Sequence, residues 1–238
     1  MIFTGEQFIP GILKPRLAEE HEARYALAKG LAVGKKVLDI ACGTGYGAYE
    51  LSQAAESVTG VDISEESIAF AKANYSRSNL TFIKASACQP LFAPANFDLI
   101  TSFETIEHLE KNDRQKYLEN LRSWLKPGGT LLLSTPNKRI TSPWTQKPLN
   151  KYHILEFTLA GLESELSRYF DIEKILGQRL IPKIYTYFLV RKSIRVFEKI
   201  FHFKNEIYDL GDGPGINEFG PNTEPRVFVC VCHPKNYV

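Results

Sequence analysis

A short apolar segment followed by closely spaced glycines is the part of this sequence best suited to bind a ligand. The segment at 36–41 is followed at once by Gly43 and Gly45. Glycines directly after a strand let the backbone turn sharply and approach a ligand closely. Asp62 ends the next predicted strand about 20 residues later, where a carboxylate can accept hydrogen bonds from both hydroxyls of a ribose. The pattern predicts a ribose-binding edge of a sheet. A glycine turn beside a capping carboxylate is the plain alternative.

A second group of polar residues follows the predicted strand 97–103. In an α-helix, Glu104, Glu107 and His108 would share one face. Two carboxylates and an imidazole can hold a divalent cation such as magnesium, manganese or zinc, and His153 is a further candidate ligand. Alternatively, Glu104 is a cap, His108 borders a cofactor and His153 lies in a surface loop. Glu107, His108 and His153 are also the candidate catalytic residues, with either histidine as a base.

Alternating strands and helices position these residues. Five apolar segments predict strands, at 36–41, 57–62, 80–84, 97–103 and 130–134. Helical spacing is found at 15–30, at 48–55, from Ser64 onward and at 114–125. Ser64 and Ser67 have capping chemistry, and residues 126–129 predict a turn. This alternation implies parallel βαβ units and an α/β fold.

The remaining sequence is less regular and predicts an insertion. Residues 158–167 and 185–201 have helical spacing, 170–176 and 226–232 are strand-like, and 209–225 is a Gly- and Pro-rich loop. The predicted organisation is a 1–34 N-terminal segment and helix, a 35–181 core, a 182–225 cap insertion, and a 226–238 closing strand and tail. A long insertion in a compact domain is usually functional or disordered, so we expect 182–225 to cap the acceptor site.

Composition excludes few functions. The chain has 238 residues and a net charge of +2, so nothing in it requires a nucleic acid partner. No apolar run approaches the roughly 20 residues that span a bilayer, and the first residues do not resemble a signal peptide. The four cysteines form no CxxC pair, which favours a reducing, cytoplasmic location. The oligomeric state is left open.

Four segments resemble the class I methyltransferases, which bind S-adenosylmethionine on a Rossmann-like sheet. VLDIACGTG at 37–45 and GVDIS at 60–64 look like the first two motifs of that family. FDLITSFETIEHL at 97–109 and LKPGGTLLLSTPN at 125–137 look like its fourth and fifth strands. The resemblance covers roughly residues 35–178. It implies a mostly parallel sheet whose last strand is antiparallel, with an N-terminal helix and a helical cap insertion.

The resemblance also implies residues that contact the cofactor. Asp39 would orient the glycine loop near the methionine end, Asp62 would hold the ribose and Ile63 would lie against the adenine. Many members carry an acidic residue after the third strand, where this chain has Lys84 to Cys88. Ser86 or the backbone at Ala87 would have to recognise the adenine instead. The complete set of expected contacts is Asp39, Gly43, Gly45, Asp62, Ile63, Ser86, Ala87 and Phe103.

Two further resemblances bear on the acceptor. TGEQFIP at 4–10 and EHEARYA at 20–26 look like the leader of methyltransferases from glycan gene clusters. In that leader Arg24 and Tyr25 either contact the cofactor or simply pack a helix beside the sheet. The ExxEH spacing with a later histidine looks like the metal site of ubiquinone-pathway O-methyltransferases and of enzymes that methylate small-RNA ends.

Together these features predict an S-adenosylmethionine-dependent transferase in glycan biosynthesis. The expected acceptor is a sugar hydroxyl in a glycan or its nucleotide-linked precursor. A phenolic or quinone-pathway small molecule is the alternative acceptor, and a non-catalytic cofactor-binding subunit is the alternative outside enzymes. Charge balance and the lack of a stacking-aromatic motif disfavour RNA.

Overall fold

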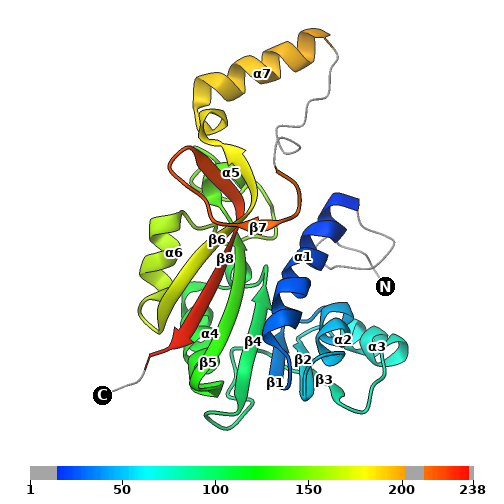
Figure 1. The fold of residues 1–238 in the computed structure, drawn as a ribbon. Helices are drawn as coiled ribbons and strands as arrows, with labels where there is room; N and C mark the ends of the chain where they lie inside the picture. The colour runs from blue at the N-terminus through cyan, green and yellow to red at the C-terminus, as the bar shows by residue number, and fades with distance from the viewer. Residues whose placement is uncertain (1–14, 202–211, 236–238) are drawn as a thin grey trace.

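A computed structural model describes residues 15–201 and 212–235 of the chain. The elements in chain order are α1 (Pro15–Leu31), β1 (Lys36–Ile40), α2 (Tyr46–Ser52), β2 (Ser57–Asp62), α3 (Glu65–Asn74), β3 (Leu80–Lys84), β4 (Phe97–Phe103), η1 (Ile106–His108), α4 (Lys111–Trp124), β5 (Leu125–Pro136), α5 (Lys138–Thr141), α6 (Leu159–Leu166), β6 (Phe170–Pro182), η2 (Lys183–Thr186), α7 (Phe188–Phe201), β7 (Ile216–Asn217) and β8 (Thr223–Pro234). Figure 1 shows their arrangement.

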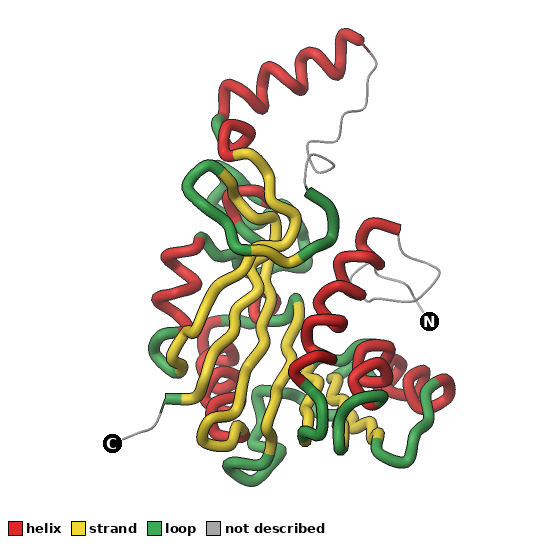
Figure 2. The backbone as a smooth tube through the Cα atoms, viewed as in Figure 1, coloured by secondary structure: helices red, strands yellow, loops and turns green. Residues whose placement is uncertain are grey.

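One sheet of eight strands runs through the described part of the molecule, in the order β3-β2-β1-β4-β5-β8-β6-β7. The first five strands in this order pair in parallel, and β8 pairs antiparallel with both β5 and β6. Figure 2 shows helices on both sides of this sheet. The predicted α/β fold with a mostly parallel sheet and an antiparallel last strand is confirmed.

Each face of the sheet carries its own hydrophobic core. Leu131 and Leu133 pack into the cluster that contains the buried residues of α4 and α6, whereas Leu132 packs into the cluster that contains those of α1, α2 and α3. Successive side chains of a strand point to opposite faces, so a continuous apolar run such as this one is suited to a strand covered on both sides.

The predicted strands and helices are found, with differences where tertiary pairing extends them. The expected turn 126–129 is a bulge within β5, because Leu125 pairs with Phe97 and pairing resumes at Thr130. Strand β6 continues to Pro182 because its second half pairs with β8. Within the expected loop 209–225, β7 adds two residues to the sheet, and residues 209–211 lie outside the described part. Ser64 caps α3 as predicted, accepting a hydrogen bond from the Ser67 N–H.

The segment 182–225 lies at one end of the sheet. Figure 1 places α7 beyond the carboxyl ends of β4 and β5, from where it extends away from the sheet. Residues 202–211 of this segment lie outside the described part of the chain, so its role as a cap stays a prediction. Among the described helices none is long and apolar enough to cross a membrane.

Gly47 lets α1 pack closely against α2. A Cβ at Gly47 would lie 1.8 Å from the ring of Tyr25. That ring cannot move freely, because its hydroxyl donates to Asp39 and it packs edge to face on Phe103, with ring centroids 5.0 Å apart. We expect Gly47→Ala to lower the free energy of unfolding by about 1–3 kcal/mol through overpacking.

Urea denaturation of Gly47→Ala and of the matched control Gly30→Ala tests this expectation. Gly30 lies in α1 with nothing within 4 Å of an added Cβ. Alanine there should be neutral or stabilise by up to about 1 kcal/mol, because glycine is a poor helix former. Equal effects of the two substitutions would contradict the close approach of Tyr25.

Candidate functional site

The glycine loop leaves β1 with backbone conformations that bring it next to the end of β2. Gly43 and Gly45 have φ values of 54° and 85°. The Gly43 N–H donates to Oδ2 of Asp62 at 2.8 Å, and the Ser64 N–H donates to Oδ1 at 2.8 Å. Each carboxylate oxygen keeps further lone pairs, so Asp62 can accept two more hydrogen bonds from a ligand. Burial raises the pKa of Asp62.

A pocket opens between this loop, α1 and the end of β4. Its walls include Gly43, Asp62 and Phe103, three of the residues predicted to contact a cofactor, together with Tyr25 and Glu104. Two of its residues, Ala41 and Glu104, have positive φ values of 56° and 50° although neither is glycine. Such strained backbone is common at functional sites.

Tyr25 has two roles in this structure. It contributes to the pocket wall and also packs α1 against the sheet, since its hydroxyl lies 3.2 Å from both oxygens of Asp39. Its neighbour Arg24 is buried and donates to Gln178 Oε1 at 2.5 Å. The leader residues 4–10 lie outside the described part of the chain.

The remaining predicted cofactor residues lie around the pocket rather than in its wall. Gly45 caps α2 behind the loop, with no room for a Cβ beside Ala71. Ile63 follows Asp62 and is 70% exposed. Ser86 accepts a hydrogen bond from the Cys88 N–H.

The segment after β3 is held beside the end of β2. The Ala85 N–H donates to the carbonyl of Asp62, and the carbonyl of Ala87 accepts from Asn120. The position of this segment is therefore suited to the adenine end of a nucleoside whose ribose lies at Asp62.

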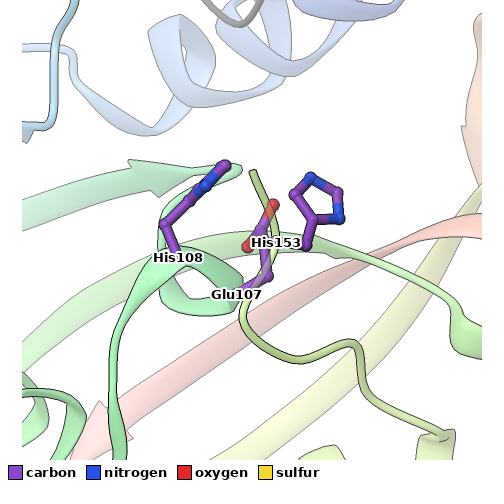
Figure 3. A group of neighbouring side chains, drawn as sticks. All are labelled: Glu107, His108 and His153. Carbon is purple, nitrogen blue, oxygen red and sulfur yellow. The ribbon is translucent and has the colours of Figure 1, made fainter. Parts of the chain in front are cut away.

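Three candidate ligands of a cation gather on the other side of the β4 terminus. One ligand atom from each of Glu107, His108 and His153 lies within 4.8 Å of the others. Figure 3 shows the three side chains. His153 comes from the loop before α6. The carbonyl of Glu107 brings it there by accepting from the N–H groups of Ile154 and Leu155.

Glu104 does not belong to this group, which corrects the expectation of a shared helical face. Its φ of 50° is left-handed, so no α-helix begins at Glu104. Residues 106–108 alone form a short 3-10 helix in this segment. Its side chain accepts from the Ser134 hydroxyl at 2.7 Å and lines the pocket instead.

A hydrogen bond at Nδ1 orients each of the two imidazoles. Nδ1 of His108 lies 3.0 Å from the carbonyl of Tyr152, and Nδ1 of His153 lies 2.8 Å from Oε1 of Glu156. Both partners are acceptors, so each Nδ1 donates to its partner. In this structure the Asn150 amide lies 2.9 Å from Nε2 of His153. Metal-binding histidines in proteins are held in this way by carbonyls and carboxylates.

Glu107 is the most unusual group of the cluster. Its side chain is fully buried, Oε2 accepts from Thr135 at 2.9 Å, and Oε1 has no hydrogen-bond partner. Burial raises the pKa of Glu107 well above its usual range, and the nearby Glu104 adds to the rise. A buried carboxylate oxygen without a partner is costly, and a cation bound there would remove that cost. The residues present therefore fit a divalent ion.

Comparisons with known proteins agree with this geometry. A family model described as a methyltransferase domain matches residues 37–129. A protein of Mycolicibacterium smegmatis named as a probable S-adenosylmethionine-dependent methyltransferase is 33% identical over 176 residues, 73% of this chain and 67% of that protein. A ubiquinone biosynthesis O-methyltransferase of Idiomarina loihiensis is 32% identical over 131 residues, covering 54% of this chain and 53% of that enzyme.

Solved structures show the same fold. A Pyrococcus horikoshii protein superposes with a TM-score of 0.65 at 20% identity, over 98% of this chain and 97% of that one. An N-methyltransferase of Bradyrhizobium japonicum in complex with S-adenosyl-L-homocysteine gives a TM-score of 0.61 at 15% identity, over 94% of this chain and 89% of that one. The sheet and its glycine-loop pocket define a Rossmann-like transferase. The chain belongs to the class I S-adenosylmethionine-dependent methyltransferases.

Asp39, beneath the pocket, generates a prediction about pH. It is 1% exposed and accepts from the Thr101 hydroxyl at 2.7 Å, yet burial raises its pKa to about 7. The folded state therefore holds this proton more tightly than the unfolded chain, whose carboxyl has a pKa of about 3.8. Without cofactor, the free energy of unfolding should fall as pH rises from about 4 to about 7, by up to about 4 kcal/mol from this group.

Urea denaturation at a series of pH values, with wild type and Asp39→Asn side by side, checks this. The asparagine variant should decline less than the wild type, because its side chain does not ionise, while Glu107 and Asp62, whose pKa values burial also raises, keep their own contributions. A variant whose profile declines as steeply as that of the wild type would show that Asp39 does not hold the proton.

Proposed function

We propose that the chain methylates a hydroxyl oxygen of a sugar, in a glycan or its nucleotide-linked precursor. The observation that carries transfer to a hydroxyl oxygen is the buried, unpartnered Oε1 of Glu107 beside two oriented imidazoles. This cluster follows the same strand, β4, whose last residue lines the cofactor pocket. An acceptor bound at the cluster would therefore lie next to the methyl group of a cofactor in the pocket.

The cofactor, S-adenosylmethionine, is assigned to the pocket at the glycine loop. Asp62 would accept from the two ribose hydroxyls, while the turn at Gly43 and Gly45 would pack against the ligand. Ile63 would cover the adenine, and Ser86 with the Ala87 backbone would meet its polar edge. Phe103 would close the pocket near the methionine end, above the buried Asp39.

In the proposed reaction the acceptor oxygen attacks the methyl carbon in line with the carbon–sulfur bond. That bond breaks, its electron pair stays on sulfur, and the hydroxyl proton must be removed. The chain contributes mainly by holding the two reactants in this geometry. His108 or His153 would take this proton, since a hydrogen bond at Nδ1 fixes the orientation of each ring at the cluster.

Glu107, His108 and His153 would hold a divalent cation at this place. When bound, such an ion supplies Lewis acidity that lowers the pKa of a coordinated hydroxyl. Glu107 would provide negative charge, and the imidazoles would complete one side of the coordination shell, leaving room for neighbouring acceptor hydroxyls. Glu156, buried behind His153 and bonded to Thr141 at 2.6 Å, would fix the orientation of that ring.

A phenolic or quinone-pathway acceptor is the second candidate. Relatives named as ubiquinone biosynthesis O-methyltransferases match about half of this chain, and His153 lies between the exposed apolar side chains of Tyr152 and Ile154. Turnover with paired panels of sugars and catechols decides between the two acceptor classes. Methylation of catechols alone would remove the sugar proposal.

The first prediction from this assignment concerns Asp62. Loss of its carboxylate removes charge-assisted hydrogen bonds, so Asp62→Ala should weaken S-adenosylmethionine binding by roughly 1–3 kcal/mol. Isothermal calorimetry measures the affinity, and circular dichroism checks that the variant folds. Glu65→Ala is the matched control, since this exposed carboxylate lies three positions after Asp62 and pairs with Lys84. Equal affinities for Asp62→Ala and wild type would contradict the placement of the ribose.

The second prediction concerns the cation. Removing divalent ions with a chelator should abolish turnover but leave cofactor affinity nearly unchanged, because the ion would act on the acceptor. Glu107→Gln should lower the affinity for added manganese at least about tenfold. The control Glu110→Gln changes an exposed carboxylate nearby and should bind manganese as the wild type does. Full activity in excess chelator would leave His108 or His153 as a simple base.

A further inference from the structure

Exposed apolar side chains are concentrated on one part of the surface. Of the twelve large apolar or aromatic side chains that are well exposed in the described residues, nine lie in segments 138–155 and 183–197. Leu189 is 73% exposed and Trp144 is 56% exposed. Scattered single apolar residues need no explanation, but a gathering of this size marks an interaction site.

The two segments meet in space, although they are far apart in the sequence. The rings of Trp144 and Phe188 pack edge to face with centroids 5.2 Å apart. Arg191 joins the segments as well, because its guanidinium lies over the Trp144 ring and donates to the carbonyl of Ile140 at 3.1 Å. Figure 1 shows α5 and α7 at the same end of the molecule. We call the surface formed by 138–155 and 183–197 the basic apolar face.

The charge of this face has one sign. The two segments contain eight lysines and arginines and no aspartate or glutamate, in a chain whose totals are nearly balanced at 29 basic and 27 acidic residues. Lys147, Lys151 and Lys192 are exposed among the apolar side chains. Arg139 pairs with an acidic group outside the face, Glu224.

We propose that the basic apolar face binds the surface of an anionic lipid bilayer. Helices and loops that combine exposed Trp, Phe and Leu with Lys and Arg insert their apolar side chains at the headgroup boundary while the cations meet lipid phosphates. The 14 residues of α7 extend away from the sheet and could lie along such a surface.

A second copy of the chain fits this face less well. In a symmetric dimer the same patch faces itself, so the exposed Lys147, Lys151 and Lys192 of the two copies would bring like charges together. An anionic bilayer provides the complementary charge for both segments at once. His153 lies within 138–155, so on the proposed function the bilayer would deliver a membrane-anchored acceptor. Lipid binding itself does not depend on that function.

Vesicle sedimentation with the full chain tests the proposal. The chain should sediment with vesicles of phosphatidylcholine and phosphatidylglycerol in equal parts, and stay largely in solution with phosphatidylcholine alone. Raising the salt concentration should release it. Lys192→Ala should weaken binding roughly fivefold, whereas Lys72→Ala, an exposed control on α3, should not.

The apolar contribution is tested by Leu189→Glu against Val33→Glu, two highly exposed side chains of which only the first lies on the face. Leu189→Glu should lower vesicle binding at least about tenfold, and Val33→Glu should leave it unchanged. No sedimentation with anionic vesicles would overturn the proposal. So would a dimer in analytical ultracentrifugation that Leu189→Glu dissociates, because the face would then be a subunit interface. Neither measurement uses turnover, so a failure of the membrane proposal can be told apart from a failure of the methylation proposal.

Discussion

Parallel pairing of β1 with β2 on one side and β4 on the other is the constraint on which the site depends. It brings the carboxyl ends of these three strands to one edge of the sheet. The glycine loop, Asp62 and the residues after Phe103 then meet, although more than 60 positions separate the first from the last. Two hydrogen bonds secure the junction, from the Gly43 and Ser64 N–H groups to the Asp62 carboxylate. A ligand can therefore span the strands without reorganising them.

Buried carboxylates surround this edge, and each is held differently. Asp39 lies under the pocket with two hydroxyl donors, which tie α1 and β4 to β1. Glu107 has one hydroxyl donor and one oxygen without a partner. Because burial disfavours the charged form of both, their pKa values are raised. Because both Asp39 donors come from neighbouring elements, Asp39 stabilises the packing of α1 and β4 on β1. Glu107 keeps one oxygen that can still bind a cation.

Backbone contacts decide how the second histidine reaches the cluster. The Glu107 carbonyl accepts from two successive N–H groups of the loop that contains His153, so this loop is fixed on η1. The same loop contributes Trp144 and Tyr152 to the basic apolar face. One loop therefore carries both a candidate catalytic residue, His153, and side chains of the proposed membrane-binding surface. Movement of this loop would affect both.

The sequence by itself determined the α/β order, the glycine loop and the acidic residue after β2, because strand periodicity and turn chemistry are local properties. It also named the three candidate ligands that the structure brings together, Glu107 and His108 in the ExxEH spacing and His153 as the later histidine. Only the tertiary structure decided that Glu104 leaves that group, because its positive φ depends on the Ser134 contact across β5. Likewise, the lengths of β6 and β8 follow from their mutual pairing, and the basic apolar face exists only where two distant segments pack together. Neither pairing between strands nor exposure to solvent is encoded in the spacing of residues along one segment.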